Sequence, residues 1–176
     1  MSQTYKGLEY FIAYDPDPAP PWEMADPALT VFAPRSPIRF GNFVPHPDPD
    51  PEIVAQSPLY LYSHSGYRVS TCPFDCRWDS GQIGICYYTR EQLKTMGHGR
   101  ITKKLVGECY GWIESTVKQW DKYLSGEVYA ASVPQLEDSC SDFYSEEDAL
   151  NWVKEVIDYH LSPESLPLWR AAKTRK

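Results

Sequence analysis

The distribution of proline constrains the fold of this chain more than any other feature of its sequence. Twelve of the 16 prolines lie in residues 1–58, where each removes a backbone donor and interrupts helix formation. The same region contains eight acidic and three basic residues, a net charge of −5. We therefore predict an acidic, proline-rich N-terminal region of short extended segments that packs on the rest of the protein.

Three segments of this region have the β-branched and aromatic residues that are typical of strands. They are Leu8–Tyr14, Leu29–Ala33 and Ile38–Val44, and each is followed by proline within two residues. Between them we expect a loop over residues 15–27. Residues 46–51, with three prolines in six positions, predict a stiff polyproline-like connector.

After residue 58 longer periodic segments replace the proline-interrupted strands. We predict one α+β domain over residues 59–165 and a basic tail over 166–176 that frays. The expected elements are a hairpin of strands 59–64 and 67–71 with a glycine-dependent turn at Ser65-Gly66, a loop over 72–84, a strand over 82–88, a helix over 90–96, a helix over 102–125, a strand over 127–133 and a helix that begins after Ser145. Strands dominate before residue 90 and helices after it, which favours a mainly antiparallel sheet covered on one face by two long helices.

The helix over residues 102–125 has the clearest pattern. Thr102 is a good N-cap, apolar residues recur at three- and four-residue spacing, and Gly126 is a typical C-terminal stop. Gly107 and Gly111 each destabilise a helix by about 1 kcal/mol relative to alanine. Close packing of another element against these glycines is the expected reason for their presence.

Charge and composition exclude several classes of function. The chain has 24 acidic and 17 basic residues, a net charge of −7, which argues against direct nucleic-acid binding because phosphate contacts need clustered Lys and Arg. No stretch approaches the ~20 apolar residues of a membrane span, and the N-terminus lacks the apolar run of a signal peptide. The chain has five cysteines, an odd number, which favours reduced thiols over a disulfide framework. We expect a cytoplasmic protein with no membrane partner.

No cofactor is expected, because the chain has neither a phosphate loop nor a dinucleotide-binding glycine motif. Zinc is the metal to consider, with Cys72, Cys76, Cys86 and His64 as the nearest set of ligands. Their spacing is not a standard one, and thiols in aromatic-rich segments usually pack as small apolar residues. We therefore expect no metal site.

Cysteine and histidine also allow a nucleophilic site. Cys76 or Cys72 would be the nucleophile, His64 its base, and Asp79 or Asp75 the group that orients the imidazole. Whether these side chains converge is left open by the sequence. The alternative is that His64 satisfies a turn and Cys76 packs inside the protein.

The segment from Arg77 to Gln82 has two interpretations. In the favoured one, Arg77 pairs with Asp79 across a turn and Trp78 fills part of the core. In the other, Arg77, Trp78, Asp79 and Gln82 form a protein-binding surface, because Trp and Arg dominate interface hot spots.

The acidic N-terminal residues Asp15, Asp17, Asp48 and Asp50 also have two interpretations. They form a negative edge that docks on a basic partner, or they only keep loops soluble and block pairing of strand edges. The sequence does not favour either one.

The central segment resembles a known family. Tyr60-Leu61-Tyr62-Ser63-His64-Ser65-Gly66 is followed by Ser70-Thr71-Cys72-Pro73-Phe74-Asp75-Cys76-Arg77-Trp78-Asp79-Ser80-Gly81-Gln82-Ile83-Gly84, and later by Tyr123-Leu124-Ser125-Gly126 and Asp138-Ser139-Cys140. This order is similar to that of a family of small, mostly uncharacterised proteins encoded by phages and other mobile elements. The family pattern has an acid at the position of Ser63 and a tryptophan at that of Ser141, and the first departure weakens any acid–histidine pairing.

The resemblance implies a mobile-element origin, and by association a role in counter-defence of the anti-CRISPR or anti-restriction type. The leading hypothesis is therefore an inhibitor that binds a host nuclease complex in the cytoplasm, on a basic nucleic-acid-binding surface. A small Cys/His-dependent hydrolase is the first alternative. A passive structural or regulatory domain is the second.

Overall fold

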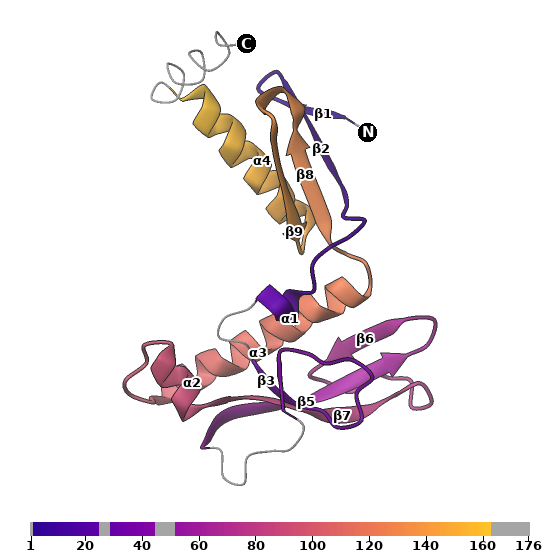
Figure 1. Ribbon diagram of the computed structural model, residues 1–176, viewed down its shortest axis with the longest axis vertical. Coiled ribbons are helices and arrows are strands. Elements are labelled where there is room, and N and C mark those ends of the chain that lie inside the picture. Colours follow the sequence, from indigo (N-terminus) through magenta and orange to yellow (C-terminus); the bar gives the residue numbers. More distant parts are fainter. Residues whose placement is uncertain (1, 25–28, 45–51, 163–176) are drawn as a thin grey trace. The chain divides into compact units, whose positions relative to one another are not determined.

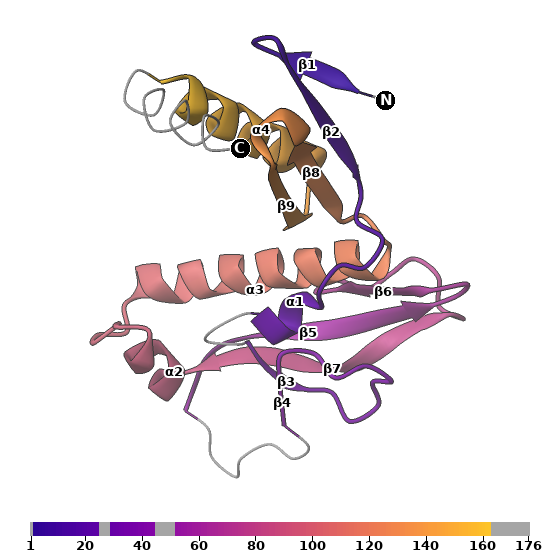
Figure 2. The ribbon, with the colours of Figure 1, turned by 45° about the horizontal axis from the view of Figure 1, so that its top comes forward.

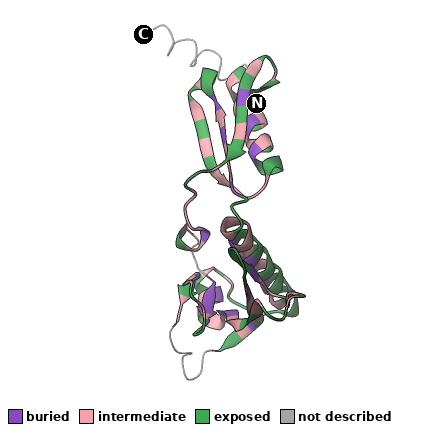
Figure 3. Ribbon diagram, turned by 90° about the vertical axis from the view of Figure 1, so that its right-hand side faces the viewer, coloured by how far each residue is buried: buried purple, intermediate pink, exposed green. Residues whose placement is uncertain are grey.

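The computed structural model describes residues 2–24, 29–44 and 52–162, which fold into two compact units (Figure 1). The central unit comprises Ala19–Ser125, and the terminal unit combines Met1–Pro18 with Gly126–Lys176. Each unit has its own hydrophobic core, and the two cores share no residue. Buried positions recur along the strands and helices of both units (Figure 3).

A five-stranded sheet forms the base of the central unit. Its strands are β3 (Thr30–Phe32), β4 (Asn42–Phe43), β5 (Ile53–Ser63), β6 (Tyr67–Ser70) and β7 (Ser80–Thr89). The order is β4-β3-β7-β5-β6, and all neighbours are antiparallel except β3 and β4. Figure 2 shows the long helix α3 (Lys103–Leu124) lying along one face of this sheet, with α2 (Arg90–Thr95) near the start of α3 and the single turn α1 (Pro21–Met24) beside it.

The predicted cap and stop of α3 are confirmed. The Thr102 side chain accepts a hydrogen bond from the Leu105 N–H, Ser125 is the C-cap, and Gly126 follows with φ +74°. One face of α3 is buried in the core, through Leu105, Cys109, Ile113, Val117 and Trp120.

The explanation offered for the glycines of α3 is wrong. A Cβ atom at Gly107 or Gly111 would meet nothing within 4 Å, and both residues are exposed. No neighbouring element therefore requires glycine at either position.

A four-stranded antiparallel sheet and one long helix form the terminal unit. The strands are β1 (Gln3–Tyr5), β2 (Leu8–Tyr14), β8 (Tyr129–Val133) and β9 (Asp138–Phe143), in the order β1-β2-β8-β9. The short 3-10 turn η1 (Pro134–Leu136) connects β8 to β9, and α4 (Glu146–Leu161) packs on one face of the sheet. Residues from β2, β8 and α4 close the core between them, namely Tyr10, Ala131, Val133, Ala149, Val153 and Ile157.

The predicted α+β class is confirmed, with largely antiparallel sheets packed against helices. Instead of one sheet under two long helices, each unit has its own sheet and its own long helix. The predicted boundary at residue 58 falls inside β5, whose residues 53–62 pair continuously with β7 apart from two irregularities. The division into two units follows from which distant segments of the chain pair as strands. Proline content gives no information on this pairing.

Several local predictions need correction. Only Asn42–Phe43 of the strand predicted over 38–44 is extended, and α1 lies within the predicted loop 15–27. The hairpin of β5 and β6 is confirmed, and Gly66 has the positive φ expected of it, at +158°, but Ser65, with φ +54°, also adopts a left-handed conformation. Strands β1 and β9 were not predicted. The connector 46–51 and the tail 166–176 both lie outside the described residues.

None of the helices in the described part of the chain combines the length and the apolar character that a membrane span requires.

Candidate functional site

The candidate site is the loop of residues 71–79 that joins β6 to β7, called here the Trp78 loop. Three hydrogen bonds hold its ends. The Cys72 N–H donates to Ser70 Oγ at 2.9 Å, the Ser63 N–H donates to the Asp79 carbonyl at 2.8 Å, and the Ser80 hydroxyl donates to the Cys76 carbonyl. The loop is therefore tied to the ends of β5, β6 and β7.

Trp78 lies outside the core. It is 96% exposed, and Arg77 beside it is exposed as well, so the favoured prediction that Trp78 fills the core is wrong. Among the described residues, neither an ion pair between Arg77 and Asp79 nor a cation–π contact between Arg77 and Trp78 is found. Gln82 is exposed and donates from Nε2 to the Gly84 carbonyl at 3.1 Å.

Asp79 instead brings together the other two residues of the predicted nucleophilic site. The Cys76 thiol lies 3.4 Å from Asp79 Oδ2, and His64 Nδ1 lies 3.5 Å from the same oxygen. The three side chains therefore converge, but on the carboxylate. In a Cys-His-Asp site the imidazole stands between thiol and carboxylate, so that it can take the thiol proton. Here the thiol points at the acid, and the His64 side chain is 66% exposed.

The candidate zinc ligands are not assembled. Cys86 is fully buried in β7, where its thiol donates to the Ser57 carbonyl at 3.6 Å, whereas Cys72 is exposed. Burial raises the pKa of the Cys86 thiol to about 12, so it stays protonated as a small core side chain. Across residues 2–24, 29–44 and 52–162, no group of three or more His, Cys, Asp or Glu side chains is arranged to hold a metal ion.

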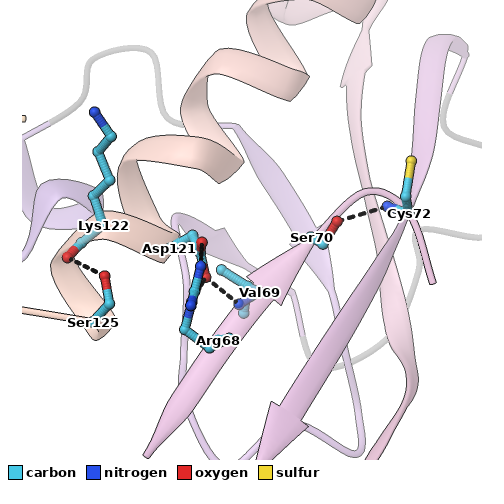
Figure 4. Close-up of polar contacts among 7 residues, drawn as sticks. All are labelled: Arg68, Val69, Ser70, Cys72, Asp121, Lys122 and Ser125. Carbon is cyan, nitrogen blue, oxygen red and sulfur yellow. Dashed lines mark hydrogen bonds and ion pairs between the residues drawn. The ribbon is translucent and has the colours of Figure 1, made fainter. Parts of the chain in front are cut away.

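The edge of the sheet beside the Trp78 loop is secured by an ion pair that the sequence analysis missed. Arg68 of β6 binds Asp121 of α3 through two hydrogen bonds, from Nε at 2.7 Å and Nη2 at 2.6 Å, and the Val69 N–H donates to the same carboxylate at 3.0 Å (Figure 4). The two residues are 53 positions apart, too far for any local spacing rule. Because β6 leads directly into the loop, this bidentate contact fixes one of its anchors.

The predicted acidic binding residues lie on the other unit or outside the described residues. Asp15 and Asp17 follow β2 in the terminal unit, and the Asp17 N–H donates to Asp15 Oδ1 at 3.0 Å. This contact forms an Asx turn that orients the Asp15 side chain. Asp48 and Asp50 fall outside the described residues.

Net charge differs between the units more than it differs along the sequence. The central unit has 11 acidic and 11 basic residues, whereas the terminal unit has 13 acidic and six basic residues. The whole net charge of −7 therefore belongs to the terminal unit. The excess of acid predicted for residues 1–58 is divided between the units, since residues 19–58, with a net charge of −3, belong to the central unit, whose residues 59–125 have a net charge of +3.

No family model matches this chain, and no match is found among the curated proteins or the solved structures. The function must therefore be inferred from the geometry.

Proposed function

We propose that this protein acts by stoichiometric protein–protein binding, with the Trp78 loop as its principal contact and Trp78 as the anchor. The observation that carries the proposal is the 96% exposure of Trp78. Burial of an exposed indole in an interface removes its apolar surface from water and thereby stabilises the complex. Trp is also the residue type most enriched in interface hot spots. Arg77, also exposed, adds the second enriched type.

The anchoring of the loop supports the same proposal. Its ends are held by three hydrogen bonds, and β6 is clamped to α3 through Asp121. A contact loop that is already ordered loses less conformational entropy on binding. The Trp78 loop therefore has the two properties of an effective anchor, an exposed aromatic and a restrained backbone.

The biological role that we propose is counter-defence. The resemblance of the segment around Cys76–Gly84 to phage and mobile-element proteins supports it. The partner would be a cytoplasmic host nuclease complex with a basic nucleic-acid-binding surface, and the acidic terminal unit would speed encounter with it. Direct binding of the nucleic acid is not part of the proposal, because the central unit has no net positive charge.

The test compares two exposed aromatics of the central unit. Tagged wild-type protein, Trp78→Ala and Tyr110→Ala are used to capture host proteins. Tyr110 is 47% exposed on α3, so it controls for loss of an exposed ring. A partner captured by wild type is then purified and titrated by calorimetry. We expect about one binding site per chain, and at least about 30-fold weaker binding of Trp78→Ala, as for a hot-spot residue. Equal affinity of both variants would refute the role of Trp78.

A phage plating assay tests the proposed role separately. Expression of the protein in bacteria that carry a CRISPR or restriction system should raise plating of a targeted phage. Trp78→Ala should abolish this rise, and Tyr110→Ala should retain it. Plating that stays unchanged in every defence background would argue against counter-defence. The binding proposal would then still be decided by the titration.

A small hydrolase is the second candidate, because Cys76 and His64 both lie within 3.5 Å of Asp79 Oδ2. Catalysis would require His64 to move toward the thiol. An enzyme acts at substoichiometric amounts, and Cys76→Ala or His64→Ala would abolish its action. We expect both variants to bind the partner as wild type does, measured by the same calorimetry.

A further inference from the structure

Among the described residues of the terminal unit, a helix covers one face of the sheet and the other face is open. Helix α4 packs on the covered face, and it is the only long helix of this unit among the described residues. On the other face the outward positions of β2, β8 and β9 line a hollow of about 470 Å³. Most of the side chains that line it from the strands are small, and they include Ala13, Ala130, Ser132, Ser139 and Ser141, with the larger Phe11 beside them.

Aromatic rings and carboxylates border this hollow. Phe11 is 40% exposed, and Tyr14 is 63% exposed while stacking on Tyr129 at a centroid distance of 5.0 Å. Asp15 and Asp17 continue the border beyond β2, joined by their Asx turn. The Asp15 N–H donates to the Val128 carbonyl at 2.8 Å, which ties this border to the segment before β8.

The terminal unit as a whole is strongly negative. The described residues of the terminal unit include twelve acidic residues and two basic ones, Lys6 and Lys154. Lys6 is paired with Asp158 at 2.8 Å. A ligand that complements this unit must therefore be positively charged.

We propose that this open face, here called the open sheet face, binds an extended segment of a partner protein that bears Lys or Arg side chains. The small side chains of β8 and β9 let a partner backbone approach closely. Phe11 offers a ring face to a guanidinium or ammonium group, and Asp15 and Asp17 offer carboxylates. This surface lies on a different unit from the Trp78 loop, so it is a second contact that goes beyond the function proposed above.

The experiment measures fluorescence anisotropy of a labelled ten-residue peptide of alternating Arg and Ser, added to the full-length protein. The double variant Asp15→Asn/Asp17→Asn is compared with Glu147→Gln/Glu155→Gln, which removes the same charge from exposed positions on α4. We expect the first to weaken binding at least about tenfold, equivalent to 1.4 kcal/mol, and the second by less than about threefold. Circular dichroism confirms that both variants are folded.

A substitution inside the hollow tests the proposal without changing an acidic residue. Ser132→Arg places a bulky cation on the open sheet face and should also weaken peptide binding about tenfold or more. Trp78→Ala should leave peptide affinity unchanged, so that failure of this proposal and failure of the proposed function are separate results. Equal weakening by the two acid variants would overturn the proposal, because net charge alone would then explain the binding.

Two results would assign the open sheet face to a different occupant and so overturn the proposal. A dimer in light scattering that Ser132→Arg converts to monomer would assign the open sheet face to a second copy. Neutralising Lys173 and Lys176 tests whether the C-terminal segment of this chain competes with the peptide for the open sheet face. Neutralising Lys94 and Lys104 of the central unit is the control. A tenfold gain in peptide affinity confined to the first pair would assign the face to that segment.

Discussion

The two units differ in how they are stabilised and in what they present to solvent. The central unit has no net charge, a core that includes Trp120 and Phe40, and an exposed Trp78. The terminal unit carries the net charge of −7 over a core made largely of alanine, valine and isoleucine side chains. The exposed Trp78 and the net charge thus lie on separate folded units, and each can be altered without the other.

The core of the central unit contains a cluster of packed aromatic rings. Trp120 stacks on Phe40 at a centroid distance of 5.1 Å, and Trp22 meets both rings edge-on. Gly41 is held with φ +52° in the same region, and a Cβ there would lie 2.5 Å from the Leu29 carbonyl oxygen. The aromatic cluster therefore depends on a backbone conformation that few other residues adopt.

The largest expected effect comes from Trp120→Ala, with Trp78→Ala as the matched control. Trp120 is 1% exposed and Trp78 is 96% exposed. Truncating the buried ring should lower the free energy of unfolding of the central unit by about 3–5 kcal/mol. Truncating the exposed ring should change it by less than about 0.5 kcal/mol. Amide hydrogen exchange reports β5 and β7 separately from β2 and β8. Equal loss of protection in both units after Trp120→Ala would contradict their division.

A smaller effect is expected for Gly84→Ala, compared with Gly81→Ala on the same strand. A Cβ at Gly84 would lie 2.1 Å from the Phe32 carbonyl oxygen, whereas one at Gly81 would meet nothing within 4 Å. Pushing β3 away from β7 should destabilise the central unit by about 1–3 kcal/mol. Urea unfolding measures the difference. Similar stability of the two variants would show that β3 does not pack on Gly84 as described.

The smallest effect concerns charge. Raising ionic strength from 10 mM to 150 mM shortens the screening length from about 30 Å to about 8 Å. Repulsion among the acids of the terminal unit weakens, so opening of β2 and β8 should become less favourable by a few tenths of a kcal/mol. The balanced central unit should change less. Hydrogen exchange at both ionic strengths tests this, and an equal response of the units would mean that their charge difference does not affect stability.

Local sequence patterns predicted the elements that local interactions stabilise. Strand β2 spans Leu8–Tyr14 as predicted, and α3 begins after Thr102 and ends before Gly126 because cap and stop residues act within one turn. Strand β9 was missed because Asp138–Phe143 is mostly polar, and pairing with β8 makes it a strand. Such pairing is a tertiary interaction that β-propensity does not encode.

The candidate site, too, was predicted only in part from local sequence. The segment Arg77–Gln82 was singled out from its residue types, but its favoured interpretation placed Trp78 in the core, and the structure exposes it. The convergence of His64 and Cys76 on Asp79 was left open by the sequence. The clamp between Arg68 and Asp121 joins residues 53 positions apart, and no local spacing rule reaches that far.

The sequence by itself determined the α+β class, the boundaries of the capped helices and the total charge, since these follow from composition and from contacts within a few residues. Tertiary structure alone decided that β1 and β2 join β8 and β9 in one sheet, that the charge collects in that unit, and that Trp78 faces solvent. Each of these depends on which distant strands pair. Pairing is selected by the burial of whole faces against a helix, so it is a property of the assembled core rather than of any single segment.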